Sequence, residues 1–279
     1  MLGLALTLLS WAPLNVTAEP ATKTDFIHFL DEDHQSRLQV ALASYINANG
    51  VQVDLVSAIH VGDATYYQDL NERFKHYDAV LYEMVGDPDG LTAEPDDKPS
   101  QMGAVRTLQV SLKRVLRLDF QLDIIDYTAA NFVHADLTLD EFIKRQEERG
   151  ETIFTFIQKA MKAQLKADGL ADAPQLGVSQ LIQAFMSIDR ASALKRLVAE
   201  QLDFSEALLG AVEKEGETVI LTDRNKRALE VLDQRLAEGD ETLAIFYGAA
   251  HCLDLERRLL AIGFQRIGQT WLTAWAMPK

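Results

Sequence analysis

Two histidines stand in matching contexts near opposite ends of the chain. The segment VDLVSAIH ends at His60, and the segment LAIFYGAAH ends at His251. In each, an apolar run leads to a small residue, Ser57 or Gly248, three positions before the histidine. Imidazole is a common metal ligand, and a small residue lets another group approach the backbone closely. The repeated pattern predicts that both histidines belong to one site.

A carboxylate and a guanidinium follow two further apolar runs. Glu83 comes directly after AVLY, and Arg224 follows VILTD. Two imidazoles and a carboxylate, from His60, His251 and Glu83, would ligate a divalent cation such as Mn²⁺, Co²⁺ or Zn²⁺ and leave room for water. The bound water would lose a proton readily and become the nucleophile. Arg224 would hold a substrate carboxylate or stabilise an oxyanion.

The same residues also allow a purely structural interpretation. Glu83 and Arg224 could form a buried ion pair without catalysis, and in a catalytic site Glu83 would be either a metal ligand or a general base. A second candidate is the H-x-D motif formed by His134 and Asp136. Asp136 either caps the helix that follows or faces a pocket, with a second metal as one option. The sequence leaves these alternatives open.

These residues require strands that end at a common edge. VQVDLVSAI and AVLYEMV are typical of buried strands, and the helical segment ATYYQDLNERFKHY separates them. ETVILT, DRNKRALEVLDQRLAEG and TLAIFYG predict a second strand–helix–strand unit, before a last helix and the terminal strands FQRIG and TWLTAWAM. We therefore expect an α/β fold whose largely parallel central sheet is built from two pseudo-repeated β–α–β units. Such a sheet places its sites at the carboxyl ends of its strands.

The middle of the chain has a different pattern. From about residue 103 to 215, apolar residues recur mostly at helical spacing, as in AVRTLQVSLKRVL and QLIQAFM. We expect residues 19–279 to form a single domain, with 103–215 inserted as a helical cap over the sheet edge.

Charge and the N-terminal segment restrict partners and location. The chain carries 42 acidic and 27 basic residues among 279, a net charge of −15, which argues against nucleic acid and anionic lipid as partners. Residues 1–18 resemble a signal peptide, with an apolar stretch too short to span a membrane. This predicts export to a periplasm or outside the cell, without stable membrane insertion after cleavage. The alternative is an apolar N-terminus on a cytoplasmic protein.

Four short segments together resemble the TraB/GumN family, which includes TIKI-like metalloproteases and is related to erythromycin esterase-like hydrolases. The segments are SAIH, LYEM, TDRN and FYGAAH with the following LDLERRLLAIGF. Ser57 departs from the family pattern, which has glycine there. The positions that match the family's motifs are His60, Glu83, Arg224, Asn225 and His251.

The resemblance implies a divalent-metal-dependent hydrolase, most often a peptidase, acting on a peptide or small molecule. In this hypothesis the metal ligands are His60, His251 and Glu83, and the substrate side of the site includes Ser57, Arg224, Asn225 and Gly248. The alternative is a non-catalytic protein that uses the same pocket to bind a peptide, a small ligand or haem.

Overall fold

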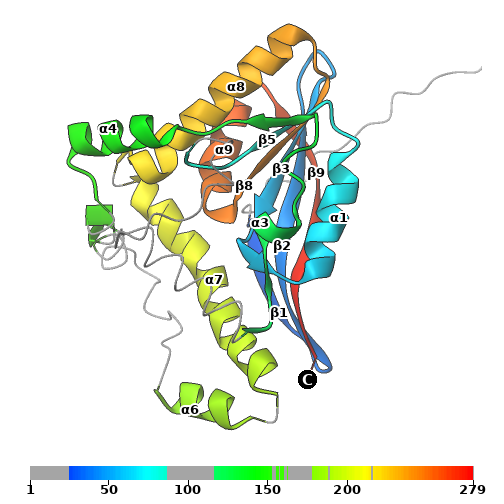
Figure 1. The fold of residues 1–279 in the computed structure, drawn as a ribbon, viewed down its shortest axis with the longest axis vertical. Helices are drawn as coiled ribbons and strands as arrows, with labels where there is room; N and C mark the ends of the chain where they lie inside the picture. Colours follow the sequence, from blue (N-terminus) through cyan, green and yellow to red (C-terminus); the bar gives the residue numbers. More distant parts are fainter. Residues whose placement is uncertain are drawn as a thin grey trace, which may run out of the picture.

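The computed structural model describes residues 25–86, 116–152, 155–156, 158–159, 162, 178–187, 189–214 and 216–278. Within these residues, seven strands form one mixed sheet, with helices on both of its faces (Figure 1). The mixed α/β class and the mostly parallel centre of the sheet agree with the sequence prediction. The predicted signal peptide, residues 1–18, lies outside the described residues.

The central strands run parallel and the flanking ones antiparallel. β3, β8, β5 and β7 are parallel neighbours, while β2 pairs antiparallel with β1, β3 and β9. The strands along the path are β1 (Ile27–Asp31), β2 (Gln35–Ile46), β3 (Gln52–Ala58), β8 (Thr242–Gly248), β5 (Ala79–Tyr82) and β7 (Phe132–His134), and β9 (Gln265–Pro278) lies beside β2. β4 (Val61–Gly62) and β6 (Asp119–Phe120) form a separate two-stranded ladder.

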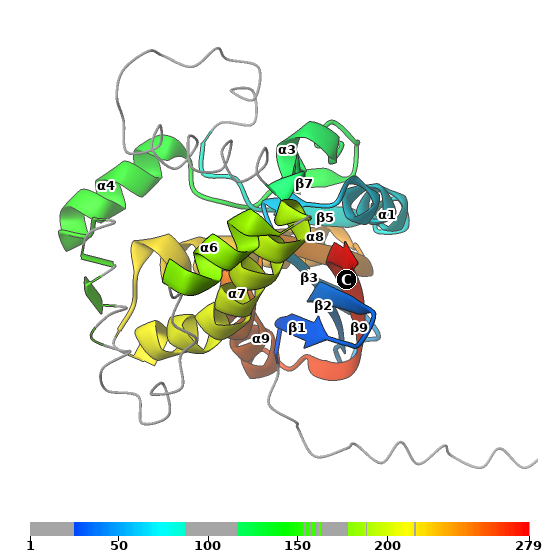
Figure 2. The ribbon, with the colours of Figure 1, turned by 90° about the horizontal axis from the view of Figure 1, so that it is seen from below.

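Buried residues on the two faces of the sheet form two apolar layers. Helix α1 (Ala64–Phe74) packs on one face through residues such as Tyr67 and Leu70. Helices α8 (Arg224–Glu238) and α9 (Ala249–Ala261) cover the other face through residues such as Leu232 and Leu255. Figure 2 shows α1 and α9 on opposite sides of the sheet. Because both faces are covered, the central strands β3, β5 and β8 read as nearly continuous apolar runs.

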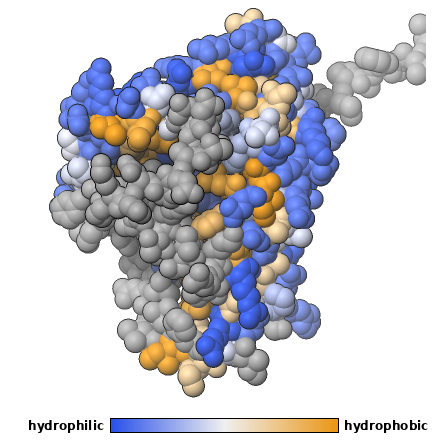
Figure 3. Space-filling view, in the orientation of Figure 1, coloured by the Kyte–Doolittle hydropathy of each residue, from blue (hydrophilic) through white to orange (hydrophobic). Residues whose placement is uncertain are grey.

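The remaining helices are α3 (Gln121–Ile124), α4 (Leu139–Arg149), α6 (Val178–Met186) and α7 (Arg190–Lys214). Helices α6 and α7 also bury residues in the layer that contains α1, among them Ala184 and Leu194. Large apolar side chains are exposed on α4 and α6, among them Ile143 and Met186, and orange patches mark both regions in Figure 3. None of the described helices is long and apolar enough to cross a membrane.

The expected strand at VILTD is wrong. Val219–Asp223 form a π-helical turn that runs directly into α8, so Arg224 begins a helix and does not follow a strand. Local acceptors explain the turn: Oγ1 of Thr218 accepts the N–H of Leu221, and a carboxylate oxygen of Glu151 accepts the N–H groups of Val219 and Ile220. These bonds replace the ladder that a strand would need.

The predicted pseudo-repeat is not confirmed. β3 and β8 are parallel neighbours and each leads into a helix, but α1 and α9 lie on opposite faces of the sheet. The first β–α–β unit exists as β3, α1 and β5, with β8 inserted between its strands. In the range 103–215, the described residues are mostly helical but also contribute β6 and β7, and β7 forms one edge of the sheet. This range is therefore not helical throughout.

Candidate functional site

The carboxyl ends of β3, β8 and β5 meet at one edge of the sheet. Ala58 at the end of β3 is level with Gly248 at the end of β8, and Tyr82 at the end of β5 is level with Phe246. Residues that directly follow these strands therefore start at the same edge, where open α/β sheets bind their ligands. His251 belongs to the first turn of α9, which begins immediately after β8.

Arg224 is the centre of a buried polar cluster at this edge. Its Nη2 donates to Oε1 of Glu83 at 2.6 Å and to Oδ2 of Asp136 at 2.6 Å. Its Nε donates to Oδ1 of Asp136 at 3.0 Å, and its Nη1 lies 3.4 Å from Nε2 of His251. The guanidinium thus joins two carboxylates and one imidazole, as its planar set of donors allows.

Glu83 is held from two sides. Oε1 accepts the bond from Arg224, and Oε2 accepts the backbone N–H of Gly248 at 2.5 Å, at the N-terminus of α9. Burial disfavours the ionised form of Glu83, but the charge of Arg224, aided by His251 and His60 and by this N–H, holds the pKa of the carboxyl well below its usual range. Glu83 is therefore a carboxylate at neutral pH.

The imidazole of His251 is fixed by a buried amide. Nδ1 of His251 lies 2.6 Å from Oδ1 of Asn225. The amide nitrogen of Asn225 donates to the backbone oxygen of His251 at 3.3 Å and to Oδ2 of Asp254 at 2.8 Å. Because the amide nitrogen has these two acceptors, its oxygen must face Nδ1, so the neutral imidazole carries its proton on Nδ1. Nε2 is then an unprotonated lone pair that points toward Arg224 and Glu83.

The charge state of His251 follows from the same surroundings. Burial and, secondarily, the positive charge of Arg224 lower the pKa of His251 to about 4, although Glu83 and Asp136 oppose the shift. The imidazole is therefore neutral at pH 7. Its side chain is 5% exposed, against 11% for those of Glu83 and Arg224, so solvent reaches the cluster mainly through the last two.

The absence of a side chain at Gly248 makes room for the carboxylate of Glu83. A Cβ atom built on Gly248 would lie 3.1 Å from Oε2 of Glu83. Its φ of −51° is ordinary, so the need for glycine here comes from the close approach of the carboxylate and not from backbone strain. This gives the small residue of the second histidine motif a physical role.

The other predicted residues have different surroundings. His60 is exposed two residues beyond β3 and contributes to the field at Glu83 and His251. Among the described residues it forms no hydrogen bond or ion pair with either of them. Ser57 is buried, and its Oγ donates to the thiol of Cys252 at 3.3 Å. Asn225 is completely buried and contacts His251, so it can position the imidazole but offers no surface to a substrate.

The arrangement bears on the predicted metal ion. Nε2 of His251 and Oε1 of Glu83 lie 3.5 Å apart, and both contact the guanidinium of Arg224. Arg224 thus supplies a positive charge to two of the three residues that were expected to bind the ion. Among the described residues, no group of three or more His, Cys, Asp or Glu side chains is arranged to hold a metal. These residues do not fit a resident metal as they are arranged, and the metal ion stays a prediction.

Asp136 is the residue whose role the sequence left undecided. It is 1% exposed, and both of its oxygens accept from Arg224. It does not cap α4, because Thr138 does so in a reciprocal capping box with Glu141. The signal was its position two residues after the end of a strand, a context close to those of Glu83 after β5 and His251 after β8.

No protein-family model matches the chain, and no curated protein and no solved structure is significantly similar to it. The resemblance to the TraB/GumN family therefore remains a prediction.

Proposed function

We propose that the chain is a hydrolase of acyl bonds, with peptides as its first candidate substrates, and that His251 is its general base. The observation that carries the proposal is the single neutral tautomer of His251, whose unprotonated Nε2 faces Nη1 of Arg224 at 3.4 Å and Oε1 of Glu83 at 3.5 Å. A fixed lone pair beside a preorganised cation is what water activation requires.

Each residue then has a defined role. Nε2 of His251 takes a proton from water while the water oxygen bonds to the acyl carbon. The guanidinium of Arg224 stabilises the developing oxyanion, and Glu83, 3.5 Å from Nε2, stabilises the imidazolium. The imidazolium returns the proton to the leaving nitrogen or oxygen as that bond breaks. Asp136 and Asn225 are positioning residues, because they contact Arg224 and His251 at the far side of each group.

The test is hydrolysis of a quenched-fluorescent peptide library and a panel of nitrophenyl esters by the purified protein. His251→Asn removes Nε2 but keeps an N–H where Nδ1 donates to Asn225, and His34→Asn, at an exposed histidine, is the matched control. We expect His251→Asn to lower kcat/KM by about 10²–10⁴-fold, the usual contribution of a general base, and the control to retain full activity. Full activity of folded His251→Asn would refute the proposal.

Chelation separates this reaction from the metal-dependent one. Without a metal requirement, turnover persists after dialysis against EDTA and 1,10-phenanthroline. Loss of turnover on chelation, restored by Zn²⁺, Mn²⁺ or Co²⁺, would support the predicted metal site and displace Arg224 as the group that stabilises the oxyanion.

A binding protein is the second candidate, and one observation favours it. All four carboxylate oxygens of Glu83 and Asp136 already have a donor, so the cluster is stable without a reactant. Saturable binding of a peptide or small molecule without turnover, in the same screen, would support this alternative.

A further inference from the structure

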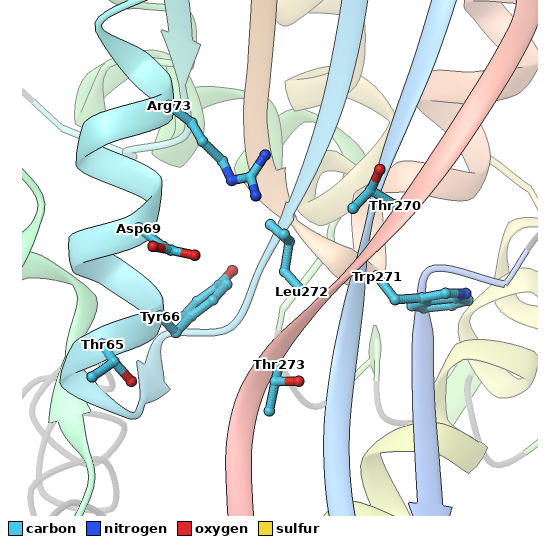
Figure 4. A pocket seen from close by; sticks show the side chains of 8 residues that line it. All are labelled: Thr65, Tyr66, Asp69, Arg73, Thr270, Trp271, Leu272 and Thr273. Atoms are coloured by element: carbon cyan, nitrogen blue, oxygen red, sulfur yellow. The ribbon is translucent and has the colours of Figure 1, made fainter.

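A cleft separate from the polar cluster lies between α1 and β9. It has a volume of about 370 Å³, within the range of small ligand sites. Figure 4 shows Tyr66 and Arg73 pointing from α1 toward the sheet, Leu272 pointing back from β9, and Trp271 pointing away. Its lining on the strand side is the consecutive run Thr270–Thr273. Consecutive residues of a strand line one cleft when its backbone edge is presented, because alternate side chains point to opposite faces.

β9 is an edge strand on this side. Within the described residues it pairs with β2 alone, so alternate backbone N–H and C=O groups point outward. Near its C-terminal end these groups are already used. The N–H of Asp63 donates to the oxygen of Ala274, and the N–H of Ala276 donates to Oδ2 of Asp63. The cleft begins where this pairing stops, at Thr273, so the outward edge at 270–273 is open to another extended chain.

Arg73 supplies an unused positive charge at one end of the cleft. Its Nε is buried and has no hydrogen-bond partner among the described residues. Asp69 lies one turn earlier on α1 but forms no ion pair with Arg73 in the described part of the chain. A buried donor without an acceptor costs free energy, and a carboxylate is the acceptor that a guanidinium binds best.

The direction of β9 decides which end of a bound peptide lies beside Arg73. Arg73 and Thr270 lie at one end of the cleft, and Thr65 and Thr273 lie at the other (Figure 4). A peptide that pairs antiparallel with β9 therefore has its C-terminal end beside Arg73. A parallel peptide would place its ammonium group there, against the guanidinium. We infer that this cleft binds the free C-terminus of an extended peptide from another protein, by strand addition to β9 and a carboxylate–Arg73 ion pair.

Fluorescence anisotropy tests the inference with a labelled hexapeptide of alternating threonine and valine that has a free C-terminal carboxylate. We expect saturable binding, with amide NMR shifts at residues 270–273. Its C-terminal amide should bind about tenfold more weakly, a loss of about 1.4 kcal/mol. A peptide N-methylated on alternate backbone amides should not bind, because strand pairing needs those N–H groups.

Two variants test whether Arg73 binds the C-terminal carboxylate of the peptide. Arg73→Gln should weaken the free-acid peptide about tenfold and remove the difference between acid and amide. Arg227→Gln, on α8 in an exposed pair with Glu230, is the matched control and should bind as the parent does. Circular dichroism confirms that both are folded. Equal binding of acid and amide, unchanged binding by Arg73→Gln, or no saturable binding would overturn the inference. So would a dimer that Arg73→Gln dissociates, because the C-terminus of a second copy would then occupy the cleft.

Discussion

Asn225 accepts a hydrogen bond from Nδ1 of His251 at 2.6 Å, and this contact decides which nitrogen of the imidazole can take a proton. The orientation of Asn225 depends in turn on Asp254, whose carboxylate also accepts from Arg257 at 2.5 Å and Arg258 at 2.6 Å. A chain of buried and partly buried bonds thus runs from the surface of α9 to the lone pair of Nε2. The tautomer of His251 is therefore set by residues behind the imidazole.

Removing the amide should release the imidazole. In Asn225→Ala the buried N–H of His251 loses its acceptor, so we expect the free energy of unfolding to fall by about 1–3 kcal/mol. The ¹⁵N chemical shifts of His251 should change from the Nδ1–H tautomer to an exchanging mixture. Asn49→Ala, at an exposed position, is the control and should change neither quantity. An unchanged tautomer in Asn225→Ala would show that Asn225 does not set it.

Arg224 should resist even a conservative exchange. Arg224→Lys keeps the charge but cannot donate to Glu83, Asp136 and His251 together in one plane. We expect it to lose about 1–3 kcal/mol of stability by leaving part of the cluster without donors, and Arg224→Leu to lose about 3–5 kcal/mol by leaving two buried carboxylates without a cation. Urea unfolding measures both, with Arg227→Lys, at a partly exposed arginine outside the cluster, as the control. Stability unchanged by Arg224→Lys would mean that Arg224 acts only as a point charge.

A methyl group at position 248 should displace the carboxylate of Glu83 and so change the surroundings of His251. In Gly248→Ala the added Cβ would stand 3.1 Å from Oε2, so the carboxylate must move away from the N–H of residue 248 and from its place beside His251. We expect lower activity and a changed pKa of His251, measured by NMR titration. Gly268→Ala is the matched control, because nothing lies within 4 Å of its Cβ position. Equal activity of the two variants would contradict the close-approach argument.

Stability should depend on pH through His251. Between pH 6.5 and about 4 the unfolded chain binds a proton at this histidine and the folded protein does not. The free energy of unfolding should therefore fall as the pH falls through this window, by about 3 kcal/mol from this group. Glu83, whose pKa is lowered on folding, adds a further loss that begins near its unfolded pKa of 4.5 and grows as the pH falls. His251→Asn should flatten the slope between pH 6.5 and 4, while His34→Asn should keep it. A parent protein without such a slope would contradict the assignment.

The strand ends were predictable because burial on both faces leaves a strong sequence signal. β3, β5 and β8 are apolar runs, and the polar residue after each run marks the edge where a site would form. His60, Glu83, Arg224 and His251 were predicted to lie together. Glu83, Arg224 and His251 are in contact, whereas His60 forms no hydrogen bond or ion pair with them among the described residues. The strand expected at VILTD was wrong, because the β-branched residues of that short run satisfy their backbone through Glu151 and Thr218, and Glu151 is remote in sequence.

The side-chain contacts within the site were not predictable. Nothing in the sequence indicates that Asp136 pairs with Arg224, 88 positions away in the chain. Nor does it indicate that Arg224 contacts two of the three residues expected to bind a metal, Glu83 and His251. Ser57 and Asn225 were assigned to the substrate side on the motif alone, whereas the fold buries both of them. Such contacts depend on how α8 and α9 pack against the sheet, which short-range patterns do not encode.

The most direct measurement of the central claim is the pH dependence of kcat/KM, recorded between pH 3.5 and 8 with chelator and with added Zn²⁺ or Mn²⁺. The acid limb of kcat/KM reports the pKa of the essential base in the free protein. If His251 is that base and Arg224, not a metal ion, is the cation of the site, the acid limb has an apparent pKa near 4, the value to which burial lowers the pKa of His251. Added metal then leaves this apparent pKa unchanged. A limb near pH 6–6.5 that shifts to lower pH as metal is added would contradict this account and support a metal site shared by His60, Glu83 and His251.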